Sequence, residues 1–256
     1  MNPFVVETAA ELSVAIGLLA VLLGALELGY RAGRREIAAS GSAPASSQVG
    51  AIQGAILGLL GLLLAFSFAA AGTRFLERQD LITTEANAIG TAVLRADLID
   101  EPQRSALRAA LRDYTVFRIG VNKRAVFEMD PADAAEFERM HARIWNAARD
   151  GVVARPTATL AVLNPVNDVI DLFTTRLAAS KKHLPVPVLA LLVLCSALAT
   201  AITGYACGIA ERTRSPLSLA LALLIGASLW ITVDLDYPRV GLLQLSDAAL
   251  EDLKFE

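Results

Sequence analysis

The stretch Val49–Thr73 most constrains this chain, because it holds about 25 consecutive residues without a charged side chain. At roughly 1.5 Å per residue, an α-helix of this length spans a hydrocarbon core of about 30 Å. Hydrophobic residues make up 55% of the sequence and aromatic residues only 6%, as is typical of membrane proteins rich in Ala and Leu. The stretch therefore predicts a membrane-spanning helix.

Small side chains recur along one side of this predicted helix. Their steps of three or four residues place them on a single face, where another backbone can approach closely. We interpret this face as a helix-packing seam. It consists of Gly50, Gly54, Gly58, Gly61, Ala65, Ala69 and Gly72.

A polar edge lies beside the seam. Gln53, Leu60 and Ser67 follow one another along the helix, and the same spiral reaches Arg74 and Arg78 past the membrane. This pattern fits the wall of a pore or a polar edge that is buried against a neighbouring helix.

Three more apolar runs complete a predicted set of four transmembrane helices. They begin near Leu12, Leu184 and Pro216, and we expect the first to be retained, since no basic start or convincing cleavage site marks a signal peptide. Residues Arg74–Pro187 contain 16 of the 23 basic and 15 of the 26 acidic residues, which indicates a water-exposed insert. We expect spans 1 and 2 in residues 1–73, the insert in 74–183, spans 3 and 4 in 184–234, and a tail in 235–256.

The insert shows only helical periodicity. An apolar stripe continues through Phe75, Ile82, Ile89 and Ala96, so the second span should extend as one helix to about Ile99. Further helices are expected over residues 103–127, 131–148 and 157–180. The predicted fold class is thus an all-α integral membrane protein with a helical soluble insert between spans 2 and 3.

Basic residues leave the sidedness open. The connection after the first span is read as a short loop from Arg31, and both short loops are basic, which would place them in the cytoplasm. Nearly as many basic residues flank the membrane on the insert side. The basic residues of the short loops are Arg31, Arg34, Arg35, Arg212 and Arg214. Those that flank the membrane on the insert side are Arg74, Arg78, Arg176, Lys181 and Lys182.

Several polar residues are candidates for a pore mouth or for coupling the insert to the spans. Asp234 and Asp236 lie at the exit of the fourth span, where they form either a hydrated helix end with local ion pairs or an acidic ring in an oligomer. Polar residues also interrupt apolar helices of the insert, and there the alternatives are a functional polar cluster and a structural hydrogen-bond network. These are Glu85, Asn87, Asn167 and Asp171.

Other classes of function find little support. His141 and His183 have no metal ligands at a suitable spacing, and Cys195 and Cys207 are too far around a helix to pair. No catalytic motif or phosphate-binding loop is visible, and a net charge of -3 does not suggest nucleic acid. We therefore predict a protein that is not an enzyme and has no metal, no cofactor and no nucleic-acid partner.

Three motifs resemble the bacterial bestrophin-like family of four-helix membrane proteins. They are GAIQGAILGLLGLLLAFSF, TEANAIGTAVLRADLI and DLDYPRVGLLQLSDAAL, and the resemblance extends over about residues 48–250. Dense acidic runs of the kind that bind calcium in animal bestrophins are absent from the sequence, so the resemblance does not extend to calcium gating.

The resemblance implies a homo-oligomeric channel, with a pentamer favoured, in the inner membrane of a bacterial cell. Its partners would be the lipid bilayer, small inorganic ions, with anions favoured, and further copies of itself. The second helix would line the pore through Ile56, Leu60 and Leu63, with Gln53 and Ser67 beyond the ends of this apolar neck. The alternative is a non-conducting scaffold or sensor whose insert binds a partner.

Overall fold

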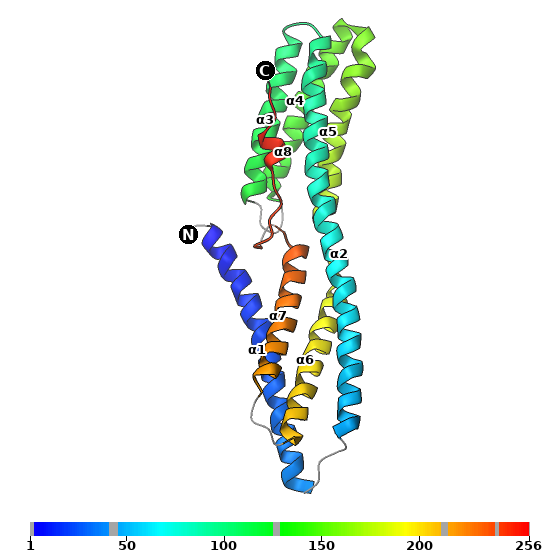
Figure 1. Ribbon diagram of the computed structural model, residues 1–256. Coiled ribbons are helices and arrows are strands. Elements are labelled where there is room, and N and C mark those ends of the chain that lie inside the picture. Colours follow the sequence, from blue (N-terminus) through cyan, green and yellow to red (C-terminus); the bar gives the residue numbers. More distant parts are fainter. Residues whose placement is uncertain (1–2, 41–45, 125–128, 211–214, 239–240, 256) are drawn as a thin grey trace. The chain divides into compact units, whose positions relative to one another are not determined.

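The computed structural model describes residues 3–40, 46–124, 129–210, 215–238 and 241–255, and within these ranges every regular element is helical (Figure 1). Four of the helices are long and apolar enough to cross a membrane. Soluble helices lie between the second and third of them in the sequence. The predicted fold class is confirmed, and the chain is a multi-pass membrane protein.

The chain divides into two compact units, each built from discontinuous segments. Unit 1 comprises Met1–Thr73 and His183–Leu243, and unit 2 comprises Arg74–Lys182 and Gln244–Glu256. The tail is therefore shared, because its first residues belong to unit 1 and its last 13 to unit 2.

Unit 1 contains α1 (Pro3–Ser40), the first half of α2 (Ser46–Arg95), α6 (Val186–Ile209) and α7 (Pro216–Asp236) (Figure 1). The loop expected from Arg31 is instead helical as far as Ser40, so that prediction is wrong. Two contacts explain the extension, since Gly33 packs on α6 and Glu36 accepts a hydrogen bond from the Tyr205 hydroxyl. Arg212 and Arg214 lie outside the described residues.

α1 and α6 approach each other more closely than side chains would permit. A Cβ added at Gly29 would overlap the carbonyl oxygen of Ala201, and one at Gly204 would overlap that of Leu26. One turn further along, Gly33 and Gly208 repeat this reciprocal pattern. Glycine spaced by four residues on both helices thus gives a backbone-to-backbone contact, as in other membrane helix pairs.

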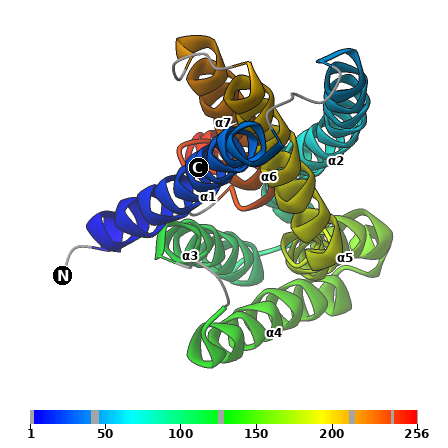
Figure 2. The same ribbon diagram turned by 90° about the horizontal axis from the view of Figure 1, so that it is seen from below.

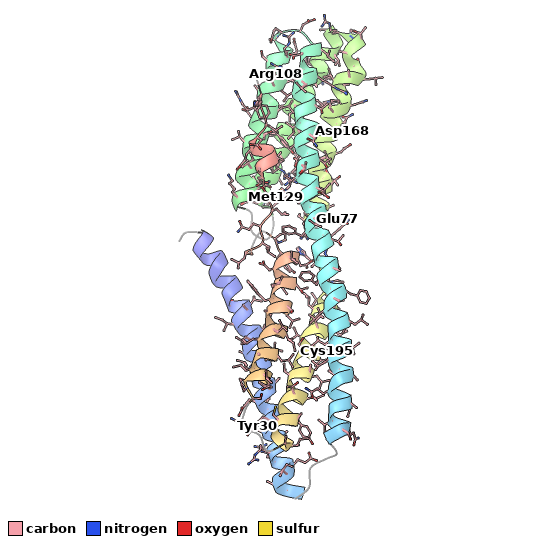
Figure 3. All side chains as sticks on the ribbon, viewed as in Figure 1. Tyr30, Glu77, Arg108, Met129, Asp168 and Cys195 are labelled. Atoms are coloured by element: carbon pink, nitrogen blue, oxygen red, sulfur yellow. The ribbon has the colours of Figure 1, made fainter. Side chains whose placement is uncertain are left out.

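The core of unit 1 is apolar and involves all four of its helices. Leu22 of α1, Leu60 of α2, Leu192 of α6 and Leu229 of α7 are each at most 3% exposed and belong to one cluster. Cys195 is half-buried beside this cluster, and Figure 3 labels it on α6.

α2 is one uninterrupted α-helix that passes the boundary between Thr73 and Arg74. The one-turn 3-10 helix η1 (Ala96–Leu98) follows it. The predicted extension of the second span into the insert is therefore confirmed, with the α-helix ending one turn earlier than expected.

Unit 2 adds α3 (Gln103–Arg124), α4 (Pro131–Ala154), the short η2 (Pro156–Ala158), α5 (Thr159–Ser180) and α8 (Ala248–Glu251). α4 packs against both α3 and α5 (Figure 2). Asp130 caps α4, because its side chain accepts a hydrogen bond from Ala132 N at 2.8 Å, and Pro131 occupies the first helical position.

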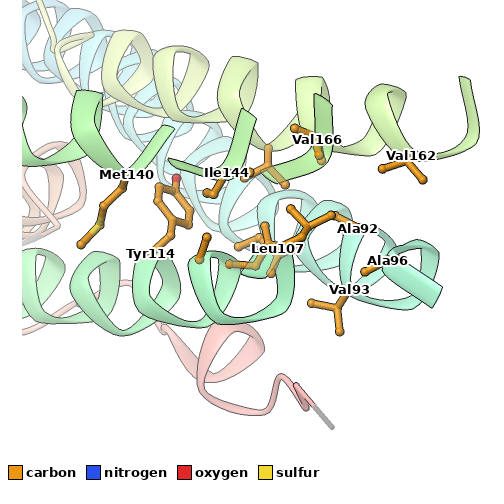
Figure 4. Close-up of a cluster of buried hydrophobic side chains, with 14 of the residues drawn as sticks. Ala92, Val93, Ala96, Leu107, Tyr114, Met140, Ile144, Val162 and Val166 are labelled. Carbon is orange, nitrogen blue, oxygen red and sulfur yellow. The ribbon is translucent and has the colours of Figure 1, made fainter. Parts of the chain in front are cut away.

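Apolar side chains from α2, α3, α4 and α5 fill the interior of unit 2 (Figure 4). Ile89, Leu107, Phe137 and Val166 are fully buried there. Leu250 of α8 is also buried in this core, which makes the tail a structural part of unit 2.

Candidate functional site

The small-residue seam of α2 is open in the single chain. Gly50, Gly54, Gly58 and Gly61 are exposed, and a Cβ added at any of them would meet no atom within 4 Å. Ala65 and Ala69 are exposed as well, while Gly72 is half-buried with the same free space around it. The α2 seam is therefore open at each of its glycines.

The predicted pore residues lie on the opposite side of α2, toward the interior of unit 1. Leu60 is 2% exposed and Ser67 is 5% exposed, whereas Ile56 and Leu63 are half-buried against the unit 1 core. Gln53 donates a hydrogen bond from Nε2 to Thr203 Oγ1 at 3.0 Å. Within one chain, Leu60 and Ser67 are buried on the face for which the sequence left two alternatives, a pore wall and a buried polar edge, and their role at a pore stays a prediction.

The side chain of Asp234 binds the backbone of the segment that follows α7. Its carboxylate is 5% exposed and accepts hydrogen bonds from the backbone N–H groups of Leu242 and Leu243, both at 3.0 Å. Gly241 is required beside it, since a Cβ at that position would overlap the Asp234 carboxylate. We call this arrangement the Asp234 clasp.

Asp236 forms a second clasp at the start of α6. The carboxylate is fully buried, and it accepts a hydrogen bond from Leu184 N at 2.7 Å. His183 lies 3.5 Å from the same carboxylate oxygen, and its ring stacks on Tyr237 with the centroids 4.2 Å apart. Both aspartates thus bind backbone within unit 1, and in this placement neither presents a carboxylate for an acidic ring.

Within unit 2, side chains of α2 form hydrogen bonds with the backbone at the end of α5 and in the tail. The buried Arg78 donates hydrogen bonds to the carbonyl oxygens of Ala179 and Lys182 at the end of α5. Gln79 forms two hydrogen bonds with the backbone of Ser246, at 2.8 and 3.0 Å. Arg74 is half-buried.

Glu85 is the centre of a buried charged cluster, which consists of Glu85, Tyr114, Arg118 and Arg176. Tyr114 donates a 2.5 Å hydrogen bond to Glu85 Oε1, Arg176 donates to Oε2, and Arg118 Nε lies 3.4 Å from Oε1. Burial by itself raises the pKa of Glu85, but the charges of Arg118 and Arg176 outweigh this effect and hold the pKa below its usual value. Glu85 is therefore ionised in the folded protein.

The other insert candidates do not join the Glu85 cluster. Asn87, Asn167 and Asp171 are exposed on the outer faces of their helices, and Figure 3 labels the neighbouring Asp168, which is also exposed. Asn87 is only two residues from Glu85, a rotation of about 200° around an α-helix, so the two side chains cannot share a face.

Reasoning from the sequence missed several residues that build these arrangements. Arg118 lies in phase with the apolar Leu111, Tyr114 and Val121, and a cation on that stripe was a signal that Glu85 has a buried partner. The four glycines of the α1–α6 contact also escaped notice, although both pairs have the four-residue spacing. For Gln79 no signal in the sequence indicated its contact with Ser246.

A comparison with protein families gives one match, to a model described as Bestrophin-like domain, over residues 16–250. No curated protein and no solved structure matches the chain. The matched residues include most of α1, all of α2, α6 and α7, unit 2 as far as Leu250 of α8, and both aspartate clasps.

Proposed function

We propose that this chain, which belongs to the bestrophin-like family, assembles into an oligomeric ion channel. In this proposal α2 lies at the subunit contacts and beside the ion path. The observation that supports this proposal is the open α2 seam. Seams of small residues are typical of close helix contacts in membranes, and α1 and α6 make such a contact within this chain. A second copy of the chain is the occupant that the α2 seam fits best.

A row of bulky side chains on the exposed side of α2 complements the seam. These residues are 48–67% exposed, and they are Ile52, Leu59, Leu62 and Phe66. Because the bulky row and the small seam lie at different angles around one helix, the row of one copy can pack into the seam of the next. Such head-to-tail contacts form a closed ring when the rotation between neighbouring copies divides a full turn, and family likeness favours a pentamer.

The ion path in this proposal follows α2. Ile56 and Leu63, which are half-buried in the single chain, remain candidates for an apolar neck. A narrow apolar ring gates by dewetting and needs no catalytic residue. Small inorganic ions are the substrates, anions are the first to test by family likeness, and the expected location is a bacterial inner membrane.

Reconstitution of the purified protein into liposomes tests the proposal. We expect ion flux from the unmodified chain and a change of at least severalfold for Ile56→Ala and Leu63→Ala. Leu224→Ala is the matched control, because Leu224 is an exposed leucine on α7 rather than α2. Equal flux from all four proteins would show that α2 does not border the path.

Liposomes that stay silent for every tested ion and pH would contradict a channel. They would support the second function, a non-conducting scaffold or sensor in which the four spans anchor unit 2. The hydrogen bonds of the buried Arg78 and of the half-buried Gln79 favour a unit 2 that keeps its structure in that role.

A further inference from the structure

The Glu85 cluster contains more positive than negative charge. Two guanidinium groups face one carboxylate, and all three side chains are at most 6% exposed. Tyr114 adds no negative charge, because burial and the neighbouring Glu85 raise its pKa well above its usual value. One buried positive charge therefore lacks a buried counter-charge among the described residues, and an unpaired buried charge is strongly unfavourable.

Two buried nitrogen atoms in the same region make no hydrogen bond with any described atom. They are Nε of Arg118 and Nε2 of His141. Arg118 Nε forms an ion pair with Glu85, but the geometry of this contact is not that of a hydrogen bond. Buried polar atoms nearly always have a partner, so each exception needs an explanation such as a bound ion.

Both groups border the same aromatic rings. The Arg118 guanidinium carbon lies 5.1 Å from the centroid of Phe173 and 5.4 Å from that of Phe137. The His141 ring lies 4.9 Å from Phe173 and 5.4 Å from Tyr114. Arg118 on α3 and His141 on α4 thus approach one interior region of unit 2 that is walled by aromatic side chains.

We propose that Arg118 and His141 hold a small inorganic anion of halide size inside unit 2. Arginine offers only donors and keeps its positive charge, which excludes a cation as the ligand. A halide accepts hydrogen bonds from N–H donors and offers no donor that would need an acceptor in return. A water molecule would satisfy the donors but would leave the charge unbalanced. The anion is structural, and the proposal does not depend on ion conduction.

Halide binding should become tighter as the pH falls. The charged and titratable groups around His141 are Glu85 on α2, Tyr114 and Arg118 on α3, and Glu138 on its own helix. Burial lowers the pKa of His141, Glu85 and Glu138 act in the opposite direction, and Arg118 lowers it further. An anion favours the imidazolium form, so protonation of His141 and halide binding strengthen each other.

Thermal unfolding of the full chain in detergent micelles tests this site. Sodium bromide is titrated against sodium gluconate at constant ionic strength, and Trp145 fluorescence reports unit 2 in a Trp230→Phe background, since Trp145 packs against the unit 2 core. We expect bromide to raise the unfolding midpoint with saturation. Arg118→Gln should abolish this response, and His141→Phe should raise the half-saturating bromide concentration about tenfold, as expected for one lost hydrogen bond to a charged group.

Arg143→Gln is the matched control, because Arg143 is an exposed arginine on α4 and should leave the bromide response unchanged. Equal unfolding midpoints in bromide and gluconate would overturn the proposal. It would also be overturned if bromide raised the unfolding midpoint of the His141→Phe variant with the same half-saturating concentration as that of the unmodified chain. Should Arg118→Gln not fold, His141→Phe decides. A response that is abolished by Leu63→Ala instead would place the halide on α2 in unit 1, which overturns this site and leaves the channel standing.

Discussion

The two glycine patterns of unit 1 share their spacing but differ in what surrounds them. At the α1–α6 contact, Gly29 and Gly204 leave no room for a methyl group, because the opposing backbone fills the space. Along the α2 seam, Gly54 and Gly58 have no neighbour within 4 Å. The spacing of small residues therefore indicates that a helix can be approached closely, but it does not say whether the approaching helix belongs to the same chain.

The largest loss of stability is expected from a substitution at the α1–α6 contact, where the opposing backbone fills the space beside the glycines. Gly204→Leu would place a side chain inside the backbone of α1, and overpacking of this kind costs more than about 3 kcal/mol when the backbone cannot move aside. We expect little folded protein, measured by recovery of a single species in size-exclusion chromatography and by the unfolding midpoint. Recovery equal to that of the unmodified chain would mean that the α1–α6 contact is not formed.

Gly241 differs from Gly29 and Gly204, because the atoms that fill the space beside it belong to a side chain and not to the backbone. Gly241→Ala should push the Asp234 carboxylate away from Leu242 and Leu243 and cost about 1.5–3 kcal/mol, as for hydrogen bonds to charged groups. Denaturant unfolding measures the loss. Gly90→Ala is the control, since its added methyl would have only an ordinary contact of 3.5 Å with Leu253.

A substitution in the α2 seam should change the mass of the particle and not the stability of the single chain. Gly58→Leu is expected to change the unfolding free energy of the protomer by no more than about 0.5 kcal/mol, as for other exposed positions. It should reduce the mass of the detergent-solubilised particle to that of a monomer, measured by light scattering. An oligomer of unchanged mass would show that the α2 seam faces lipid, and a loss of folding would show that it packs within the protomer.

The smallest effect is expected from Gly54→Ala. Replacing an exposed helical glycine by alanine stabilises a protein by about 0.4–1 kcal/mol, because the unfolded chain loses freedom. The α2 seam already contains Ala65 and Ala69, so the oligomer should tolerate the change. The unfolding midpoint and the particle mass together check this, and dissociation of the particle would indicate a contact as tight as that of α1 and α6.

The spans and helices could be predicted because they depend on local patterns. The uncharged run of α2, the Asp130 cap and the apolar stripe from Ile82 to Ala96 each have a signal within a few turns of the chain. The α1–α6 contact could not be predicted in the same way. Each of its helices contributes only two glycines, and their pairing joins residues that lie far apart in the sequence.

The polar residues show the same limit. Glu85 and Asn87 are equally conspicuous in the sequence, but helical phase buries the first and exposes the second. Asp234 and Asp236 could be recognised as unusual at the end of a span. Their roles depend on Leu242 and Leu184, whose backbone N–H groups reach them only in the folded chain.

The discontinuity of unit 2 has a consequence for biosynthesis. Helices form in microseconds, whereas ribosomes add about 5–20 residues per second. About 60 residues separate Lys182 from Gln244, so several seconds pass between synthesis of α5 and synthesis of the segment that places Leu250 in the core. During that interval the newly made helices of unit 2 expose the apolar surface that the tail later covers, which makes this the stage at which a chaperone or premature self-association has the most surface to bind.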